Sequence, residues 1–326
     1  MVEVNLVEAV NRALSWELEH DHEVLLLGED IGVNGGVFRA TDGLQSRYGS
    51  ERVIDTPLAE TLIAGMSIGL AVQGLKPVAE IQFMGFIYSA LENILNHASR
   101  MRNRTRGRLT CPMVLRAPYG GGIHAPEHHS ESTEAIFAHI PGLRVVIPSS
   151  PGRAYGLLLA AIRDPDPVVF LEPKRIYRLQ KERLNDKGEA LPLDVCFTLR
   201  DGEDITLVSW GAMLVETLQA AEELAHLGVA AEVIDVASIK PLDMKTILTS
   251  VEKTGRCIII HEAARTGGVG AEISAQLAEY ALTSLLAPVQ RVTGYDTVMP
   301  LYRLENYYMP TVKQIVTAAT KALEYA

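Results

Sequence analysis

Short apolar runs typical of strands alternate with helical segments along most of the chain, and this alternation restricts its fold more than any other feature. Val24–Leu27, Val78–Phe83 and Val168–Leu171 have the length and composition of buried strands. Helical segments such as Leu6–Leu18, Tyr88–Arg102 and Gly152–Arg163 lie between such runs. Strands separated by helices favour mainly parallel sheets covered by helices. We therefore predict an α/β architecture.

The alternation is interrupted between about residues 178 and 200, where the sequence is rich in charge and has no clear periodicity. It resumes with a strand at Ile205–Ser209 and helices at Met213–Leu227 and Val269–Tyr280. A length of 326 residues favours two domains. We expect domains at residues 1–185 and 186–326, each a mainly parallel sheet flanked by helices.

The overall composition excludes several classes of protein. A formal net charge of −10 argues against a general nucleic-acid binder. The three cysteines are widely spaced, which disfavours disulfide frameworks and zinc sites and suits a reducing compartment. The longest uncharged stretch, Thr61–Leu75, is too short to span a bilayer. We expect a cytoplasmic protein with no nucleic-acid or membrane partner.

A carboxylate stands at the start of the least charged helical segment, Ala59–Gln73. Asp55 ends a predicted strand and Pro57 cannot continue it, so Glu60 falls in the first turn of the helix. The helix dipole alone favours an acid at this position. A carboxyl near apolar surface can also exchange protons, because burial raises its pKa. The spacing leaves both interpretations open.

Residues 120–131 combine three glycines with three histidines and two glutamates. The glycines and Pro126 disfavour a helix, so His124 and His128 would not share a helical face. The order also differs from that of the HExxH metal motif. A loop at the carboxyl ends of strands, with one histidine transferring protons, is favoured over a transition-metal site. A polar loop whose histidines only bind backbone groups stays an alternative.

Two further segments resemble binding motifs, but structural roles are favoured for both. Five arginines lie within residues 100–108 at the end of a predicted helix, without interleaved aromatic residues. A solvated helix end or a partner contact is favoured there over nucleic acid. The glycines of Arg265–Gly270 match neither phosphate-binding motif, and a tight turn with close helix packing is favoured.

Taken together, the chain resembles the β subunit of the E1 component of 2-oxo acid dehydrogenase complexes, a transketolase-like thiamine diphosphate family of the pyruvate and branched-chain type. The resemblance covers essentially the whole chain. It is carried by LLLGEDIGVNGGVFRATDGL at 25–44, RVIDTPLAE at 52–60, KPVAEIQFMGF at 76–86, HSESTEAIFAHIPGLRVVIPSSP at 129–151, DPVVFLEPKRIYR at 166–178 and SIKPLDMKTILTSVEKTGR at 238–256.

The resemblance implies specific site residues. Glu60 would bind N1′ of the cofactor's aminopyrimidine and serve as a catalytic acid, and Phe86 would stack on the pyrimidine ring, with Leu58 and Gln82 as neighbouring wall positions. His129, rather than His128, would assist acyl transfer to the lipoyl group of E2. A structural potassium ion is implied at Asp164 and Asp166 with the carbonyls of Met113, Ala161 and Ile162.

The family's Mg²⁺ and diphosphate motif, GDG followed by Asn-Asn, does not occur in this chain, where residues 202–204 read Gly-Glu-Asp. The resemblance therefore implies that an α subunit holds Mg²⁺ and the diphosphate in an α₂β₂ heterotetramer. The second domain would serve dimerisation and E2 docking.

The expected activity is decarboxylation of pyruvate or a branched-chain 2-oxo acid, followed by reductive acylation of the lipoyl group of E2, by a subunit active only with α. The alternatives are an acetoin dehydrogenase E1 β subunit and a non-catalytic assembly subunit of the same fold. Transketolase and deoxyxylulose-phosphate synthase are disfavoured because the chain is too short and lacks the diphosphate motif. A 2-oxo acid:ferredoxin oxidoreductase would have a different chain pattern.

Overall fold

The computed structural model describes residues 1–325, which form two compact units. One unit comprises Met1–Tyr119 and Ile136–Leu193, and the other comprises Gly120–Ala135 and the chain from Asp194 onward. The sequence places a single domain break at residue 185, whereas in the structure the segment Gly120–Ala135 groups with the second unit. Each unit is described separately below.

The first unit is built on a parallel sheet with the strand order β6-β7-β5-β4-β2-β3. These strands are almost continuously apolar, as expected of strands covered by helices on both faces. Their bounds are β2 Val24–Gly28, β3 Val53–Asp55, β4 Lys76–Glu80, β5 Val114–Tyr119, β6 Arg144–Val146 and β7 Val168–Pro173. Because the strands are parallel, their carboxyl ends lie at one edge of the sheet.

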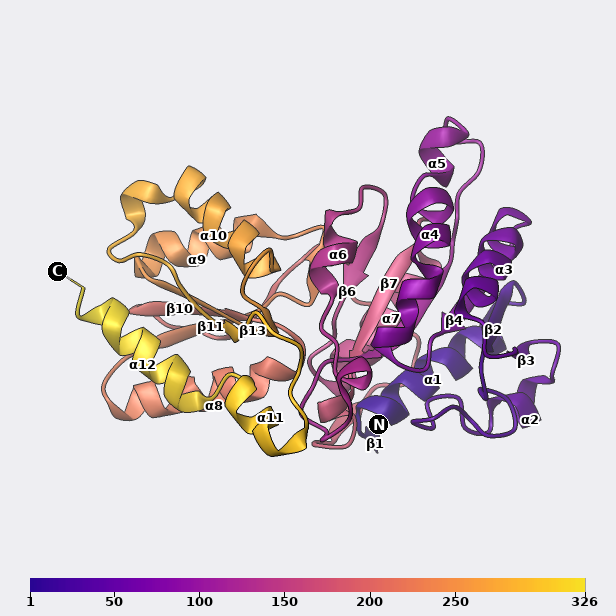
Figure 1. The fold of residues 1–326 in the computed structure, drawn as a ribbon, viewed down its shortest axis with the longest axis horizontal. Helices are drawn as coiled ribbons and strands as arrows, with labels where there is room; N and C mark the ends of the chain where they lie inside the picture. Colours follow the sequence, from indigo (N-terminus) through magenta and orange to yellow (C-terminus); the bar gives the residue numbers. More distant parts are fainter. Residues whose placement is uncertain (326) are drawn as a thin grey trace. The chain divides into compact units, whose positions relative to one another are not determined.

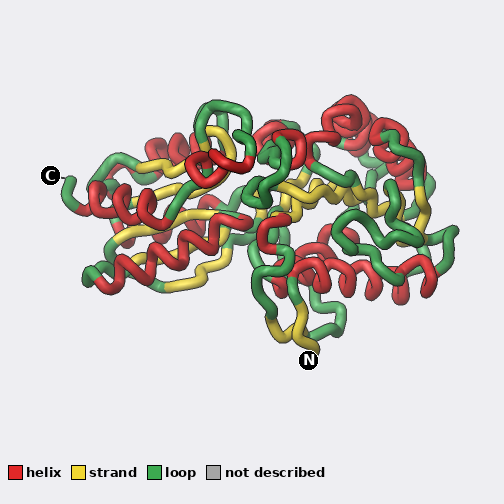
Figure 2. The backbone as a smooth tube through the Cα atoms, turned by 60° about the horizontal axis from the view of Figure 1, so that its bottom comes forward, coloured by secondary structure: helices red, strands yellow, loops and turns green. Residues whose placement is uncertain are grey.

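Helices cover this sheet, and α1 (Leu6–His20) and α7 (Pro151–Arg163) lie side by side (Figure 1). Asn5 and Glu8 form a capping box at the start of α1, and the Ser150 side chain caps α7. The other helices are α2 Leu44–Tyr48, α3 Glu60–Val72, α4 Leu91–Asn93, α5 Met101–Arg104 and α6 Glu134–His139. A small antiparallel pair, β1 (Val2–Val4) with β8 (Glu182–Leu184), lies at the N-terminus (Figure 2).

The predicted helix over Tyr88–Arg102 is wrong in detail. The chain forms a 3₁₀ helix at Met84–Ala90, the short α4, a π-helical turn at Ile94–Ala98, and then α5. Side-chain bonds to the backbone compete here with the regular helical ladder, since Ser89 Oγ donates to the Phe86 carbonyl at 3.2 Å. The preceding strand likewise ends at Glu80, before the predicted Phe83.

The second unit has a sheet with the order β14-β13-β10-β11-β9, in which only β9 is antiparallel to its neighbour. Figure 1 shows α8 and α12 on one face and α9 and α10 on the other. The strands are β9 Phe197–Arg200, β10 Ile205–Ser209, β11 Ala231–Asp235, β13 Cys257–Ala264 and β14 Gln290–Gly294, with a short β12 at Ser238–Lys240. The helices are α8 Leu214–His226, α9 Met244–Thr254, α10 Val269–Tyr280, α11 Tyr302–Tyr308 and α12 Val312–Leu323.

The apolar core of the second unit packs α8, α12 and the strands β10, β11 and β13 together. The expected fold class, α/β with two mainly parallel sheets flanked by helices, is confirmed. No helix within residues 1–325 combines the length and apolar character needed to cross a membrane.

Candidate functional site

Glu60 lies in the first turn of α3, as the sequence predicts, and is its first residue; its side chain is half-buried. Its Oε2 accepts a hydrogen bond from Ser89 Oγ at 3.3 Å. The start of α3 is also tied to the irregular segment after β4, because Thr61 Oγ1 donates to the Ser89 carbonyl at 2.6 Å and Asn93 Nδ2 donates to the Thr61 carbonyl at 3.0 Å. These bonds fix the place of the carboxylate at the edge of the sheet.

A second carboxylate lies near Glu60. Glu29 follows β2 directly, and burial together with the negative charges of Asp30 and Glu60 raises its pKa above the ordinary value. The hydroxyl oxygen of Thr56, in the turn before α3, is buried and makes no hydrogen bond within the described residues. This edge of the sheet therefore presents acids and an unused polar group, as a site for a hydrogen-bonding ligand does.

The predicted ring-stacking residue stands at the end of a row of aromatic side chains. Phe86 packs edge-on against Phe83 with ring centroids 5.8 Å apart, Phe83 packs against Phe38 at 5.5 Å, and Phe38 packs against Tyr177 at 5.3 Å. Leu58 is 71% exposed and Gln82 is half-buried. Because Leu58 follows β3 and the other two follow β4, all three lie beyond the same edge of the sheet as Glu60.

A buried charge cluster joins the strand ends behind this row. Arg116 on β5 donates to Glu80 on β4 at 2.8 Å and to Glu172 on β7 at 2.6 Å, and Tyr177 Oη donates to Glu172 at 2.6 Å. Burial raises the pKa of Glu80, while the two carboxylates outweigh burial and hold the pKa of Arg116 above its usual value. The cluster thus fixes the carboxyl ends of three neighbouring strands and the tyrosine that begins the aromatic row.

In the second unit, two buried glutamates hold the glycine–histidine loop. Gly121 N donates to Glu262 Oε2 at 2.7 Å, and Gly122 N donates to Glu305 Oε1 at 2.7 Å. Glu305 Oε2 accepts from His124 N at 2.9 Å and lies 2.7 Å from His124 Nδ1. The sequence did not reveal either glutamate, because each lies more than a hundred residues from the loop.

His129 lies in a short 3₁₀ turn, Glu127–His129, where its side chain is half-buried while that of His128 is exposed. A cavity of about 300 Å³ lies beside this turn and is lined by Glu127, Ser130, Glu131, Ser132, Ala263, Ala264, Thr297, Val298, Met299 and Tyr308. Burial, with nearby carboxylates, raises the pKa of Tyr308 to about 12, so its hydroxyl keeps its proton at neutral pH. The cavity thus has a mixed wall of polar and apolar side chains that includes the Tyr308 side chain, whose hydroxyl is a potential donor.

The residues of the implied potassium site contact cationic side chains. Asp164 Oδ2 pairs with Arg144 at 2.8 Å, and Asp166 pairs with Arg102 at 2.8 Å. The carbonyl of Met113 accepts from Val168 N at 3.0 Å, the carbonyl of Ala161 accepts from Asp164 N at 3.4 Å, and Ile162 is buried. Within residues 1–325, no group of three or more His, Cys, Asp or Glu side chains is arranged to hold a metal ion.

The structure also describes the other two segments noted in the sequence, Arg265–Gly270 and residues 100–108. A turn at residues 266–267 precedes α10, and the helix lies close to the sheet, since a Cβ at Gly270 in its first turn would lie 2.8 Å from His261 Nε2. This confirms the tight turn. The arginines of residues 100–108 are all exposed.

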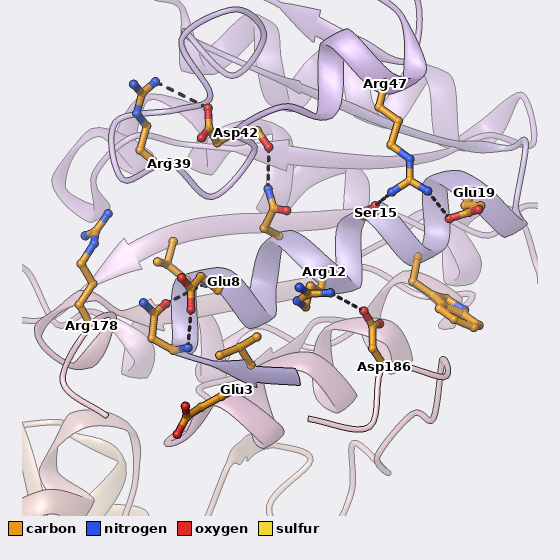
Figure 3. Close-up of a pocket in the computed structure, with 15 residues that line it drawn as sticks. Glu3, Glu8, Arg12, Ser15, Glu19, Arg39, Asp42, Arg47, Arg178 and Asp186 are labelled. Atoms are coloured by element: carbon orange, nitrogen blue, oxygen red, sulfur yellow. Dashed lines mark hydrogen bonds and ion pairs between the residues drawn. The ribbon is translucent and has the colours of Figure 1, made fainter. Parts of the chain in front are cut away.

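A hollow of about 730 Å³ beside α1 was not found from the sequence (Figure 3). Several of the charged side chains that line it form ion pairs with one another, as Arg12 does with Asp186 and Arg47 with Glu19.

Two family models together match most of the chain. Residues 2–180 match the transketolase pyrimidine binding domain, and residues 196–315 match the transketolase C-terminal domain. A solved chain of the same fold, the split-gene transketolase in its inactive β4 tetramer, has a TM-score of 0.82 and 25% identity and covers 99% of both chains. The fold is therefore that of a transketolase-like chain.

Relatives with higher sequence identity show which family of transketolase-like chains this chain belongs to. The pyruvate dehydrogenase E1 component subunit beta of Staphylococcus epidermidis and that of Bacillus subtilis are each 46% identical over 325 residues, covering 100% of both chains. The protein from Staphylococcus aureus is 45% identical over the same length. The chain belongs to the family of E1 β subunits of 2-oxo acid dehydrogenases.

Proposed function

We propose that this chain is the β subunit of a heteromeric, thiamine diphosphate-dependent 2-oxo acid dehydrogenase. It decarboxylates a 2-oxo acid and reductively acylates the lipoyl group of an E2 protein, together with an α subunit. The observation that carries this proposal is the position of Glu60 at the start of α3, beside Ser89 and Glu29, in a chain with full-length E1 β relatives. Pyruvate is favoured over branched-chain acids because the relatives are pyruvate dehydrogenase subunits.

The residues at the sheet edge fit the pyrimidine half of thiamine diphosphate. Glu60 would hold a proton at N1′ of the aminopyrimidine, Phe86 would stack on the ring, and Leu58 and Gln82 would form the adjacent walls. The bound cofactor supplies the electron-accepting thiazolium for decarboxylation, and the protein positions and tunes it. Glu29 lies near enough to Glu60 for the charge of Glu60 to contribute to the raised pKa of Glu29, so two neighbouring acids stand at this edge of the sheet.

The second half of the site would come from an α subunit, which holds Mg²⁺ and the diphosphate, in an α₂β₂ heterotetramer. The lack of GDG and Asn-Asn motifs in the sequence supports this division. The related split-gene transketolase, inactive as a β4 tetramer, is consistent with such a requirement for a second chain. His129 would assist acyl transfer to the lipoyl group, and residues 186–326 would serve dimerisation and E2 docking.

A structural potassium ion stays a proposal for Met113, Ala161, Ile162, Asp164 and Asp166. Binding would draw Asp164 and Asp166 away from Arg144 and Arg102, with which they pair in this structure. A cytoplasmic location likewise stays a prediction.

The proposal is tested by mixing the chain with its α subunit, Mg²⁺ and thiamine diphosphate. Reduction of an artificial acceptor is then followed with pyruvate, 2-oxoisovalerate, 2-oxobutyrate and acetoin in parallel. Activity that requires both chains supports the proposal, and turnover by the β chain alone contradicts it. A preference for acetoin would favour the alternative of an acetoin dehydrogenase, and inactivity of a correctly assembled complex would favour a non-catalytic assembly subunit.

Two pairs of variants test the residue roles. Glu60→Gln should leave assembly intact and lower decarboxylation severely, whereas Glu92→Gln, an exposed acid on α4, should leave it unchanged. His129→Ala should reduce lipoyl acylation more than artificial-acceptor turnover, and His128→Ala should reduce neither. Equal loss of both activities in His129→Ala would contradict the assigned role.

A further inference from the structure

The Ser89 hydroxyl lies between the two residues proposed to bind the aminopyrimidine. Its Oγ is 3.3 Å from Glu60 Oε2 and 3.2 Å from the carbonyl oxygen of Phe86. A hydroxyl carries one hydrogen, so Ser89 donates fully to only one of these acceptors at a time. An ionised carboxylate is the stronger acceptor, because hydrogen bonds to charged groups are roughly twice as strong as those between neutral groups. Within residues 1–325, the Glu60 carboxyl accepts a hydrogen bond from no other group.

The backbone of Ser89 is held in place without help from its side chain. Its carbonyl accepts from Thr61 Oγ1 at 2.6 Å, and Asn93 Nδ2 donates to the Thr61 carbonyl at 3.0 Å. The helices α3 and α4 pack closely here, since a Cβ added at Gly65 would lie 3.4 Å from Asn93 Nδ2. Removing the Ser89 hydroxyl would therefore leave its segment attached to the start of α3. The bond to Glu60 is consequently not needed to hold the two segments together.

The bond from Ser89 makes the two oxygens of the Glu60 carboxyl different. Oε2 accepts from the hydroxyl, whereas Oε1 has no hydrogen-bond partner in the described part of the chain. An oxygen that accepts from a hydroxyl is disfavoured as the site of the carboxyl proton, because protonation turns that oxygen into a donor. The proton of Glu60 is thereby directed to Oε1, the oxygen left for a ligand at the edge of the sheet.

We infer that Ser89 is a positioning residue for the acid of the proposed site: its hydroxyl holds Oε2 of Glu60 and so presents Oε1, with its proton, to N1′ of the aminopyrimidine. The inference rests on the proposed function and adds to it the residue that orients Glu60. Proton transfer depends on the placement of the acid to within a fraction of an ångström. Loss of the hydroxyl should therefore slow proton transfer more than it weakens binding of the cofactor.

The test uses three variants of the full-length chain, each assembled with the α subunit, Mg²⁺ and thiamine diphosphate. Ser89→Ala removes the hydroxyl, and Ser89→Thr keeps it. Ser46→Ala is the matched control, because Ser46 is exposed and its Oγ donates at 2.7 Å to the Gly43 carbonyl, three residues earlier, and to no carboxylate within residues 1–325. The readout is the rate at which deuterium replaces the proton at thiazolium C2 of the bound cofactor, followed by NMR after acid quenching. Calorimetry on the same complexes gives the dissociation constant for thiamine diphosphate.

We expect C2 exchange to be about five- to tenfold slower in Ser89→Ala, the size of effect that loss of one hydrogen bond produces. The kcat for pyruvate should fall in parallel, with little change in KM. Ser89→Thr and Ser46→Ala should exchange at about the wild-type rate. The dissociation constant for thiamine diphosphate should be nearly the same in all four complexes.

Equal exchange in Ser89→Ala and the wild-type complex would overturn the inference. Equal slowing in Ser89→Thr, or cofactor binding weakened by the same factor as exchange is slowed, would also overturn it, because either result indicates a purely structural effect. These results would leave the proposed function in place, provided that the wild-type complex turns over a 2-oxo acid. A wild-type complex that neither binds thiamine diphosphate nor exchanges the C2 proton would instead contradict the proposed function itself.

Discussion

Glu305 and His124 meet twice: the same carboxylate oxygen accepts from the histidine's backbone amide at 2.9 Å and lies 2.7 Å from its Nδ1. With Nδ1 engaged, the outer face of the imidazole, with Nε2, is left for other partners, and 58% of the side chain is exposed. A buried carboxylate thus orients an exposed histidine, an arrangement that fixes both the tautomer and the direction of the ring.

Replacing Glu305 with glutamine should destabilise the chain. A glutamine turns an NH₂ group toward the amides that Glu305 accepts from, so at least one buried donor loses its acceptor at a cost of about 1–3 kcal/mol. Urea unfolding measures this change. Glu279→Gln, an exposed substitution on α10, is the control, and identical midpoints for the two variants would show that Glu305 does not anchor the loop.

Replacing Arg116 should lower the free energy of unfolding more than replacing Glu305 does. Arg116→Met leaves Glu80 and Glu172 buried without their cation, and breaking a buried ion pair in this way costs about 3–5 kcal/mol. Arg102→Met removes the exposed pair with Asp166 and should shift the urea midpoint little. The prediction fails if the two substitutions are equally mild.

His261 predicts a dependence of stability on pH. Burial lowers its pKa from 6.5 to about 4 in the folded chain, so below pH 6.5 the unfolded state binds more protons than the folded state. The contribution of neutral His261 to the free energy of unfolding is fully present above pH 6.5. It declines by about 1.4 kcal/mol per pH unit as the pH falls toward 4. Urea unfolding at several pH values should give a shallower slope for His261→Gln than for the wild-type chain. Parallel slopes would argue against a neutral buried imidazole.

The three cysteines should be inert in the native chain. Cys111, Cys196 and Cys257 are buried, and burial raises the pKa of Cys111 and of Cys257 to about 12. Since the thiolate is the reactive form, an aromatic disulfide reagent should titrate none of them in buffer and all three in guanidinium chloride. Rapid reaction of one thiol in buffer would reveal an accessible thiolate.

The sequence predicted the regular parts of the fold because apolar periodicity is a local signal. Helix Val269–Tyr280 and strand Ile205–Ser209 have the predicted bounds. The region after Glu80 was predicted poorly, since side-chain bonds such as that of Ser89 to Phe86 decide its course. No local pattern marks these bonds.

For the site, the sequence placed Glu60 correctly at the start of its helix, because Pro57 and the apolar run after it mark that boundary. It missed Glu262 and Glu305, whose partners in the loop are 141 and 183 residues away along the chain. Such pairings follow from tertiary packing rather than from spacing. The aromatic row from Tyr177 to Phe86 was missed for the same reason.

The chain leaves its first compact unit after Tyr119 and returns to it at Ile136. Neither unit is consequently one continuous piece of polypeptide. A gene fragment ending at Leu193 would encode the histidine loop without either glutamate that anchors it. Chimeras between related E1 β chains should therefore exchange residues 120–135 together with the C-terminal half, so that loop and anchors come from the same parent.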